Sequence, residues 1–277
     1  MASPPTPLAT PARSADLSEL LQAPPSPRLR WARFKANPAI VVIEYPNLHE
    51  QGLAMNRLAA MFEKRRARRD RVPNDAELAE LMRRSGDSVA SFYQGHDYPA
   101  ANVARFFSQA EAQHLPLNPH EVQLRALMLE AALMTQIAEG TYRAVGNQAV
   151  VSFTGVQPDD PLTAADERVD ALRREAVLRH ELSHGRFFTD PAYRAHCIRF
   201  WRQTLREGER RVFTAYLKGL DYNPADEELM ANETQALLMH TPDARAFNAA
   251  NLGVGEPTLA QWRTRFRAGE PATGLGR

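Results

Sequence analysis

The sequence predicts a mainly α-helical protein of the α+β class, with a small β element and a helical N-terminal region. Beyond residue 50, apolar residues recur every three or four positions, as they do in helices that bury one face. Several of these segments begin with Asn-Pro or Asp-Pro, an N-cap followed by proline at the first helical position. Only two short apolar runs, 39–45 and 148–154, indicate strands.

Three regions follow one another along the chain. Residues 1–30 hold seven of the 20 prolines and show little apolar periodicity, so we expect a disordered arm. Residues 31–140 form the helical N-terminal region, and residues 141–277 follow either as a separate domain or as part of the same one. In the helical region we expect a buried strand at 39–45 and helices at 52–69, 75–84, 99–113 and 119–138.

The region from residue 141 onward begins with the clearest strand of the sequence. Residues 148–154 are rich in β-branched side chains and lie between Gly146-Asn147 and Gly155. Helices are then expected from Thr163, with acidic residues in its first turns, from Asp190-Pro191 to about Gly219, from Asn223-Pro224 to about Thr241, and after Pro257.

The charge balance argues against nucleic acid as the default partner. The 34 basic and 33 acidic residues leave a net charge of +1, so long-range electrostatic steering is weak. The basic run at 64–71 lacks interleaved aromatic residues and is interpreted as a solvated helix end. No apolar stretch is long enough to span a bilayer. The single cysteine, Cys197, excludes an internal disulfide and a cysteine-cluster metal site.

The first residues carry no apolar core of the kind found in signal peptides. A proline-rich start suits a mature chain whose export signal has been removed, so we expect a periplasmic or secreted protein. A cytoplasmic location is the alternative, because a natural proline-rich tail looks the same and a single cysteine fits both compartments.

One short motif carries the chemistry. Residues 180–184 are His-Glu-Leu-Ser-His, an HExxH pattern. Two histidines four residues apart lie one above the other on a helix and can bind the same metal ion. The intervening Glu181 reaches a metal-bound water rather than the metal, and zinc lowers the pKa of such a water to about 7. The motif therefore predicts a zinc site with Glu181 as the general base.

The surroundings of the motif favour a metal over a chance match. The residues that precede His180 at helical spacing are apolar, so the two imidazoles continue an apolar face and need buried partners. The third ligand is expected to be Glu233, the one carboxylate in the apolar stripe of a later helix, because a buried carboxylate requires a cation or a proton. The alternatives are Glu227, Glu228 and His240.

These features resemble the gluzincin division of zinc metallopeptidases. The resemblance rests on HELSH at 180–184, on Asn-Glu-Thr-Gln-Ala at 232–236 in a later helix, and on a strand before the first of these helices. It covers roughly residues 145–240. It implies a zincin-like catalytic region within residues 141–277 that holds Zn²⁺ and cleaves peptide bonds.

Carried over residue by residue, the resemblance makes His180, His184 and Glu233 the zinc ligands and Glu181 the base. It also makes the strand before the first helix the sheet edge that binds extended substrate. The residues of that strand expected to contact the substrate are Val150, Val151, Ser152 and Phe153.

The chain departs from the family beside the expected Glu ligand. Many gluzincins carry an aspartate four residues after this Glu, where it orients a ligand histidine. That position is Leu237 here, so we expect Asp190 or Asp226 to serve instead. A hydrogen-bond donor to the developing oxyanion is also required, and by residue type we favour Tyr222 over Tyr193, His196 and His240.

The function predicted from these residues is hydrolysis of a peptide or related amide bond, with a peptide or protein as the substrate. One alternative is a binding or regulatory protein that retains the metallopeptidase fold without turnover. Another is a helical interaction module in which the motif is a coincidence. Peptidoglycan cross-links, a partner protein and short peptides are all open as substrates, and the sequence does not indicate the oligomeric state.

The remaining histidines are expected to face solvent or to cap loops. They are His49, His96, His114 and His120. The run His96-Asp97-Tyr98, between Gly95 and Pro99, is the one upstream cluster that is a candidate to line a cleft.

Overall fold

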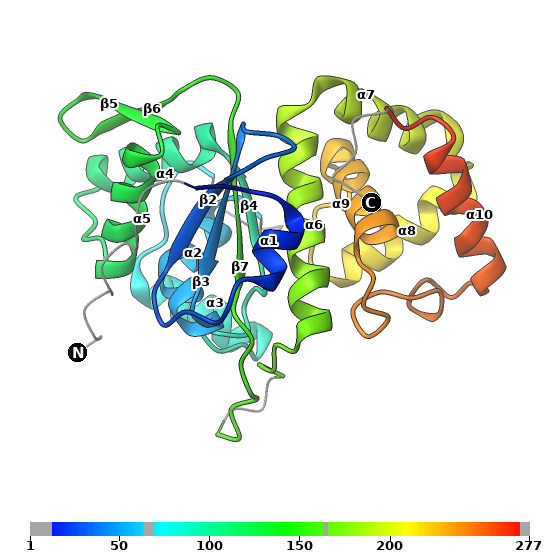
Figure 1. The fold of residues 1–277 in the computed structure, drawn as a ribbon, viewed down its shortest axis with the longest axis horizontal. Helices are drawn as coiled ribbons and strands as arrows, with labels where there is room; N and C mark the ends of the chain where they lie inside the picture. The colour runs from blue at the N-terminus through cyan, green and yellow to red at the C-terminus, as the bar shows by residue number, and fades with distance from the viewer. Residues whose placement is uncertain (1–12, 64–68, 163–165, 272–277) are drawn as a thin grey trace.

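The computed structural model describes residues 13–63, 69–162 and 166–271. It confirms a mainly helical α+β protein with a small mixed sheet. Figure 1 shows helix α6 (Ala171–Thr189) upright in the middle of the molecule, between the sheet with its N-terminal helices and a C-terminal group of helices. Within the described ranges, no helix is long and apolar enough to cross a membrane.

The main sheet has five strands in the order β1-β2-β3-β7-β4. Strand β3 (Ile40–Tyr45) pairs parallel with β7 (Ala149–Thr154), and β4 (His96–Pro99) pairs antiparallel with the other side of β7. Strands from both halves of the sequence therefore form one sheet. Through this pairing the regions 31–140 and 141–277 share one sheet.

Two layers of helices cover the faces of this sheet. Helices α2, α4 and α5 bury one face of β3 and β7 in an apolar core that includes Val41 and Val150, and α6 buries the other face against Val42 and Val151. All six residues of both strands are buried as a result. The helices of the first layer are α2 (Leu48–Phe62), α4 (Ala100–Ala112) and α5 (Pro119–Glu130). Helix α3 (Asp75–Ser85) packs against α2 and has no buried residue.

Caps explain where most of these helices begin. Asn47, Asn74 and Asn118 each accept a hydrogen bond from a backbone N–H of the first helical turn. Helix α5 ends at Glu130, although we expected it to continue to 138. The chain turns at Ala132, which has a positive φ of 53°, and forms a hairpin of β5 (Met134–Ala138) and β6 (Thr141–Ala144).

The C-terminal half is a group of helices packed around large aromatic side chains such as Phe213, Trp262 and Phe266. One expected helix from 190 to 219 is in fact two, interrupted by a π-helical turn at Phe200–Thr204 and by the extended Leu205. The elements are α7 (Pro191–Arg199), α8 (Glu207–Gly219), α9 (Glu227–His240), a 3-10 turn (Ala250–Leu252) and α10 (Glu256–Arg267).

Helix α6 begins later than expected. We placed its start at Thr163, which lies outside the described residues. Residues 166–170 are not helical: Val169 forms a β-bridge with Gln157, and Asp170 is the N-cap of a helix that starts at Ala171. The acidic residues at 166 and 167 belong to the preceding loop rather than to a first helical turn.

The expected disordered arm is ordered over residues 13–30, and residues 1–12 lie outside the described part. Strand β1 (Arg13–Ala15) pairs with β2 (Arg30–Phe34), which the sequence did not reveal. Helix α1 (Leu17–Gln22) has a capping box and buries Leu17 and Leu20 against the sheet. Arg174 of α6 donates to the Leu20 carbonyl oxygen (2.9 Å) and to Glu44 of β3 (2.8 Å), which fixes α1 in place.

Candidate metal centre

Three of the expected site residues meet where α6 packs against α9. The Nε2 atoms of His180 and His184 lie 3.0 Å apart, because one helical turn separates the two residues. Oε2 of Glu233, on α9, lies 4.0 Å from Nε2 of His180 and 3.8 Å from Nε2 of His184. One nitrogen or oxygen from each of the three residues thus lies within 4.8 Å of the others.

A buried chain of hydrogen bonds holds the two helices in this orientation. The Gln235 amide on α9 donates to the Ser183 hydroxyl (3.1 Å), which in turn donates to the carbonyl oxygen of His180 (2.7 Å). The Tyr193 hydroxyl donates to Oε1 of Gln235 (2.6 Å). Because Gln235 and Ser183 are fully buried, these bonds fix how the two helices are rotated about their axes.

The other ring nitrogen of His180 is held by a hydroxyl. Nδ1 of His180 lies 2.8 Å from Oγ1 of Thr241, directly after α9, and the Thr241 hydroxyl donates to the Ala236 carbonyl oxygen (3.0 Å). Thr241 must therefore accept from the Nδ1–H of His180, and this leaves the lone pair of Nε2 for a cation.

Asp190 and Asp226, which we expected to orient a ligand histidine, do not do so. Asp190 accepts from the backbone N–H groups at the start of α7, and Asp226 accepts from Leu229 N–H at the start of α9. Short acidic side chains next to a helix start bond to their own backbone, and this use competes with any role at a distance.

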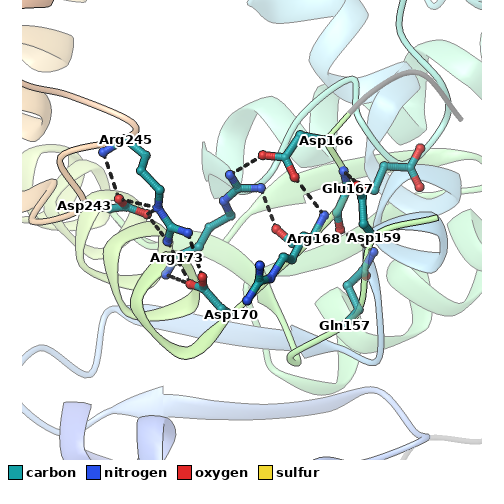
Figure 2. A network of polar contacts seen from close by, with 9 residues as sticks. All are labelled: Gln157, Asp159, Asp166, Glu167, Arg168, Asp170, Arg173, Asp243 and Arg245. Atoms are coloured by element: carbon teal, nitrogen blue, oxygen red, sulfur yellow. Dashed lines mark hydrogen bonds and ion pairs between the residues drawn. The ribbon is translucent and has the colours of Figure 1, made fainter. Parts of the chain in front are cut away.

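An ion-pair network anchors the segment that carries Thr241. Figure 2 shows Arg245 between Asp243, two residues after Thr241, and Asp170, the N-cap of α6. The guanidinium of Arg245 donates to both carboxylates at 2.6 to 3.0 Å. The network therefore ties the residue that orients His180 to the beginning of the helix on which His180 lies.

The electrostatics of the three groups suit a cation. Burial raises the pKa of Glu233 to about 7, against the opposing effect of His184, and burial together with His184 and His240 lowers the pKa of His180 well below its usual value. Among the described residues, Nδ1 of His184 and Oε2 of Glu181 have no hydrogen-bond partner. Two imidazoles and a carboxylate are a donor set typical of zinc, and two nitrogens on one tetrahedral zinc lie about 3.3 Å apart. The residues present therefore fit zinc.

Glu181 lies beside this cluster, close to an acid from strand β4. Oxygens of the Glu181 and Asp97 carboxyl groups lie within 4.8 Å of each other and of a ring nitrogen of His184. Burial, and the proximity of the two acids, raise the pKa of Glu181 well above its usual value, and burial also raises the pKa of Asp97. Oδ2 of Asp97 lies 4.0 Å from Nε2 of His184. Asp97 was expected only as a candidate to line a cleft, since nothing in its spacing connects it to HExxH.

The cluster opens into a cavity of about 570 Å³. Tyr222 lines it together with Glu233, and interaction with the Tyr222 hydroxyl lowers the pKa of the Glu233 carboxyl, against the larger effect of burial. The other oxyanion candidates lie elsewhere: His240 contacts the Tyr193 hydroxyl (3.1 Å) outside this lining, and His196 packs against Phe266 with ring centroids 4.5 Å apart. Of the four candidates, the structure thus brings only Tyr222 to the cavity.

Strand β7 is not the sheet edge that we expected to bind substrate. Val150, Val151, Ser152 and Phe153 are buried, with β3 on one side and β4 on the other. The edge strand is β4, and its Asp97, Tyr98 and Pro99 line the cavity. The run AVVSFT does not alternate between apolar and polar residues, which is typical of a central strand covered on both faces.

The histidines outside the motif also differ from expectation in part. His96 and His120 are buried, whereas His49 and His114 lie at the surface or partly exposed. His96 is enclosed because β4 joins the sheet there, and burial lowers its pKa to about 3.

No family model, curated protein or solved structure matches the chain.

Proposed function

We propose that the protein is a zinc-dependent hydrolase, and most simply a peptidase of the gluzincin type. The observation that carries the proposal is the convergence of both HExxH histidines and Glu233 beside Glu181, at the wall of a cavity large enough for several peptide atoms. The order of the parts supports a zincin-like fold: a helix with two histidines under an antiparallel edge strand, followed by a helix with the glutamate.

In this proposal His180, His184 and Glu233 hold the ion. Zinc bound there supplies a Lewis acid for the substrate carbonyl oxygen and lowers the pKa of the attacking water. The Glu181 carboxylate takes the proton from that water and returns it to the leaving amine. The Tyr222 hydroxyl donates a hydrogen bond to the oxygen on which negative charge develops.

The exposed side of β4 supplies the place for an extended substrate. The Ala100 N–H donates to the Gln148 carbonyl oxygen (2.9 Å), and bonded residues alternate along an antiparallel ladder. The backbone groups of His96 and Tyr98 therefore face β7, and those of Asp97 face away from it. A peptide segment that pairs with Asp97 would pass directly over the histidines of α6.

The proposal is tested by metal content and turnover together. Purified protein should retain close to one zinc per chain after dialysis and release it to a chelator. The holoprotein should cleave at least one member of a quenched-fluorescent peptide library. His184→Ala should lose the zinc, because two protein donors compete poorly with water. Glu181→Gln should keep the zinc and lose about 100-fold or more in kcat.

Matched controls separate these effects from loss of the fold. Glu228→Gln changes a cavity-lining acid that pairs with Arg194 at the surface, and it should leave zinc content and kcat unchanged. A wild-type protein without zinc would overturn the proposal. Stoichiometric zinc without hydrolysis would favour the non-catalytic binding protein instead, and an active Glu181→Gln variant would exclude Glu181 as the base.

A further inference from the structure

Asp97 is an acidic residue that the HExxH chemistry does not account for. It comes from the edge strand β4, faces the cavity, and has a side chain that is 20% exposed. An oxygen of its carboxyl group lies within 4.8 Å of one from Glu181, and its Oδ2 lies 4.0 Å from Nε2 of His184. An acid that contacts the general base from the substrate-binding strand has a position suited to controlling that base.

Gly95 provides a second, independent observation on the same side chain. A Cβ atom at this position would lie 2.4 Å from Oε1 and 2.7 Å from Cγ of Glu181. The φ angle of Gly95 is not in the left-handed region, so the conformation of the backbone does not require glycine here. The requirement is space, since the Glu181 side chain lies directly against the backbone of residue 95.

Within the described part of the chain, Oε2 of Glu181 has no hydrogen-bond partner. Glutamate has three rotatable side-chain bonds. If its side chain is free to rotate, fixing the one rotamer that the reaction requires costs conformational entropy. Gly95 and Asp97, two residues apart, both lie close to this carboxyl group and limit the positions that it can take.

We propose that Asp97 is a positioning residue for the general base, and that Gly95 and Asp97 together form a seat at the start of β4 that holds the Glu181 carboxyl toward the metal centre. The inference deepens the proposed function and depends on it for the role of Glu181. It also connects substrate to base, because the backbone of Asp97 is what an added peptide strand would pair with.

Direct metal binding by Asp97 is the competing role, and the geometry favours positioning. The cluster of His180, His184 and Glu233 is complete without Asp97, which groups only with Glu181 and His184. A ligand and a positioning residue give opposite results in a metal-binding measurement, so the two roles are separable by experiment.

The test is a double-mutant cycle between Asp97 and Glu181, with acetohydroxamate affinity for the zinc-loaded protein as the readout. A hydroxamate on zinc hydrogen-bonds to the same carboxyl group that serves the attacking water. Asp97→Ala should weaken acetohydroxamate binding about tenfold in the wild-type background and leave it unchanged in Glu181→Gln. Asp97→Asn keeps a hydrogen-bond donor and should restore most of the affinity. Glu228→Ala, at another cavity-lining acid, should have no effect in either background.

Zinc affinity, measured by chelator competition, should change by less than about threefold in Asp97→Ala. A loss of zinc in this variant would overturn the inference and make Asp97 a ligand. Equal losses of acetohydroxamate affinity in both backgrounds would overturn it as well, since Asp97 would then act independently of Glu181.

A thermal-unfolding cycle on the metal-free protein keeps this inference separate from the proposed function. If the two acids contact each other, the shift in Tm of the double variant should differ from the sum of the two single shifts. If the wild-type protein binds no zinc, the proposed function is refuted. The role of Asp97 is then refuted as well, even if the Tm shifts are non-additive. If the protein binds zinc but the Tm shifts are additive, the inference about Asp97 is refuted and the proposed function is not.

Discussion

Replacement of Glu233 by leucine should have opposite effects on stability with and without zinc. Glu233 is 6% exposed, and burial raises its pKa from 4.5 to about 7. A carboxyl group whose pKa is raised in the folded protein destabilises the fold at higher pH. At pH 8 this shift corresponds to about 3 kcal/mol. Leucine removes that cost and also the polar interaction with the Tyr222 hydroxyl, whose loss costs about 1 kcal/mol.

The metal-free Glu233→Leu protein should therefore unfold with a free energy about 2 kcal/mol larger than that of the wild type, a rise in Tm of roughly 5 °C for a chain of this size. With zinc at 1,000 times its Kd, the wild type gains about 4 kcal/mol and the variant gains little, since it lacks a ligand. The variant should therefore be the more stable protein without zinc, and the wild type should be the more stable protein with zinc.

Differential scanning fluorimetry at pH 8, with a chelator or with added zinc, measures this reversal. Glu228→Leu, on the same helix but exposed, should change the free energy of unfolding by less than about 0.5 kcal/mol under both conditions. If Glu233→Leu keeps the full stabilisation by zinc, the third ligand is another residue. If the metal-free variant is less stable than the metal-free wild type, ionised Glu233 does not destabilise the fold as reasoned above.

Three further changes probe the parts around the site. Gly95→Ala should keep zinc but lower kcat at least tenfold, because the new Cβ displaces Glu181, and it should cost about 1–3 kcal/mol in an unfolding titration; normal kcat would contradict the close approach. Thr241→Val should weaken zinc binding about 10- to 100-fold in chelator competition, since Nδ1 of His180 loses its acceptor; unchanged affinity would show that the hydroxyl is dispensable. Burial lowers the pKa of His96 from 6.5 to about 3, so only the unfolded chain takes up this proton between these values and stability falls as pH drops below 6.5. Between pH 7.5 and 5.5, denaturant titrations of wild type should therefore show about 1.4 kcal/mol more loss than those of His96→Gln, and equal losses would mean that His96 is protonated in the fold.

Local signals in the sequence were sufficient for the helices that carry the site. The four-residue spacing of His180 and His184 and the apolar stripe around Glu233 depend only on helical periodicity, and both predicted the observed faces. The start of α6 was wrong because acidic residues at 166 and 167 imitate a first helical turn. In the structure these acids bond to Arg173 and Ser88, as loop residues.

The contacts that complete the site could not be predicted in the same way. Strand β4 has four residues with little apolar character, and it exists because β7 offers it a partner. Asp97 reaches Glu181 only through that pairing. Thr241 reaches His180 only because α9 ends beside α6. Sequence periodicity gives the face of one helix or strand, and the order of strands in a sheet has to come from tertiary packing.

The proline that ends β4 has a consequence for how the protein behaves at high concentration. An open sheet edge is a template on which a second copy of the chain can assemble, and proline on an edge strand is one of the ways in which proteins prevent this. Pro99 has no N–H to donate, so the outer side of β4 presents the N–H and C=O of Asp97 but no continuous ladder. An edge this short can hold a brief extended segment over the cavity, yet it is too short to join molecules into a continuous sheet.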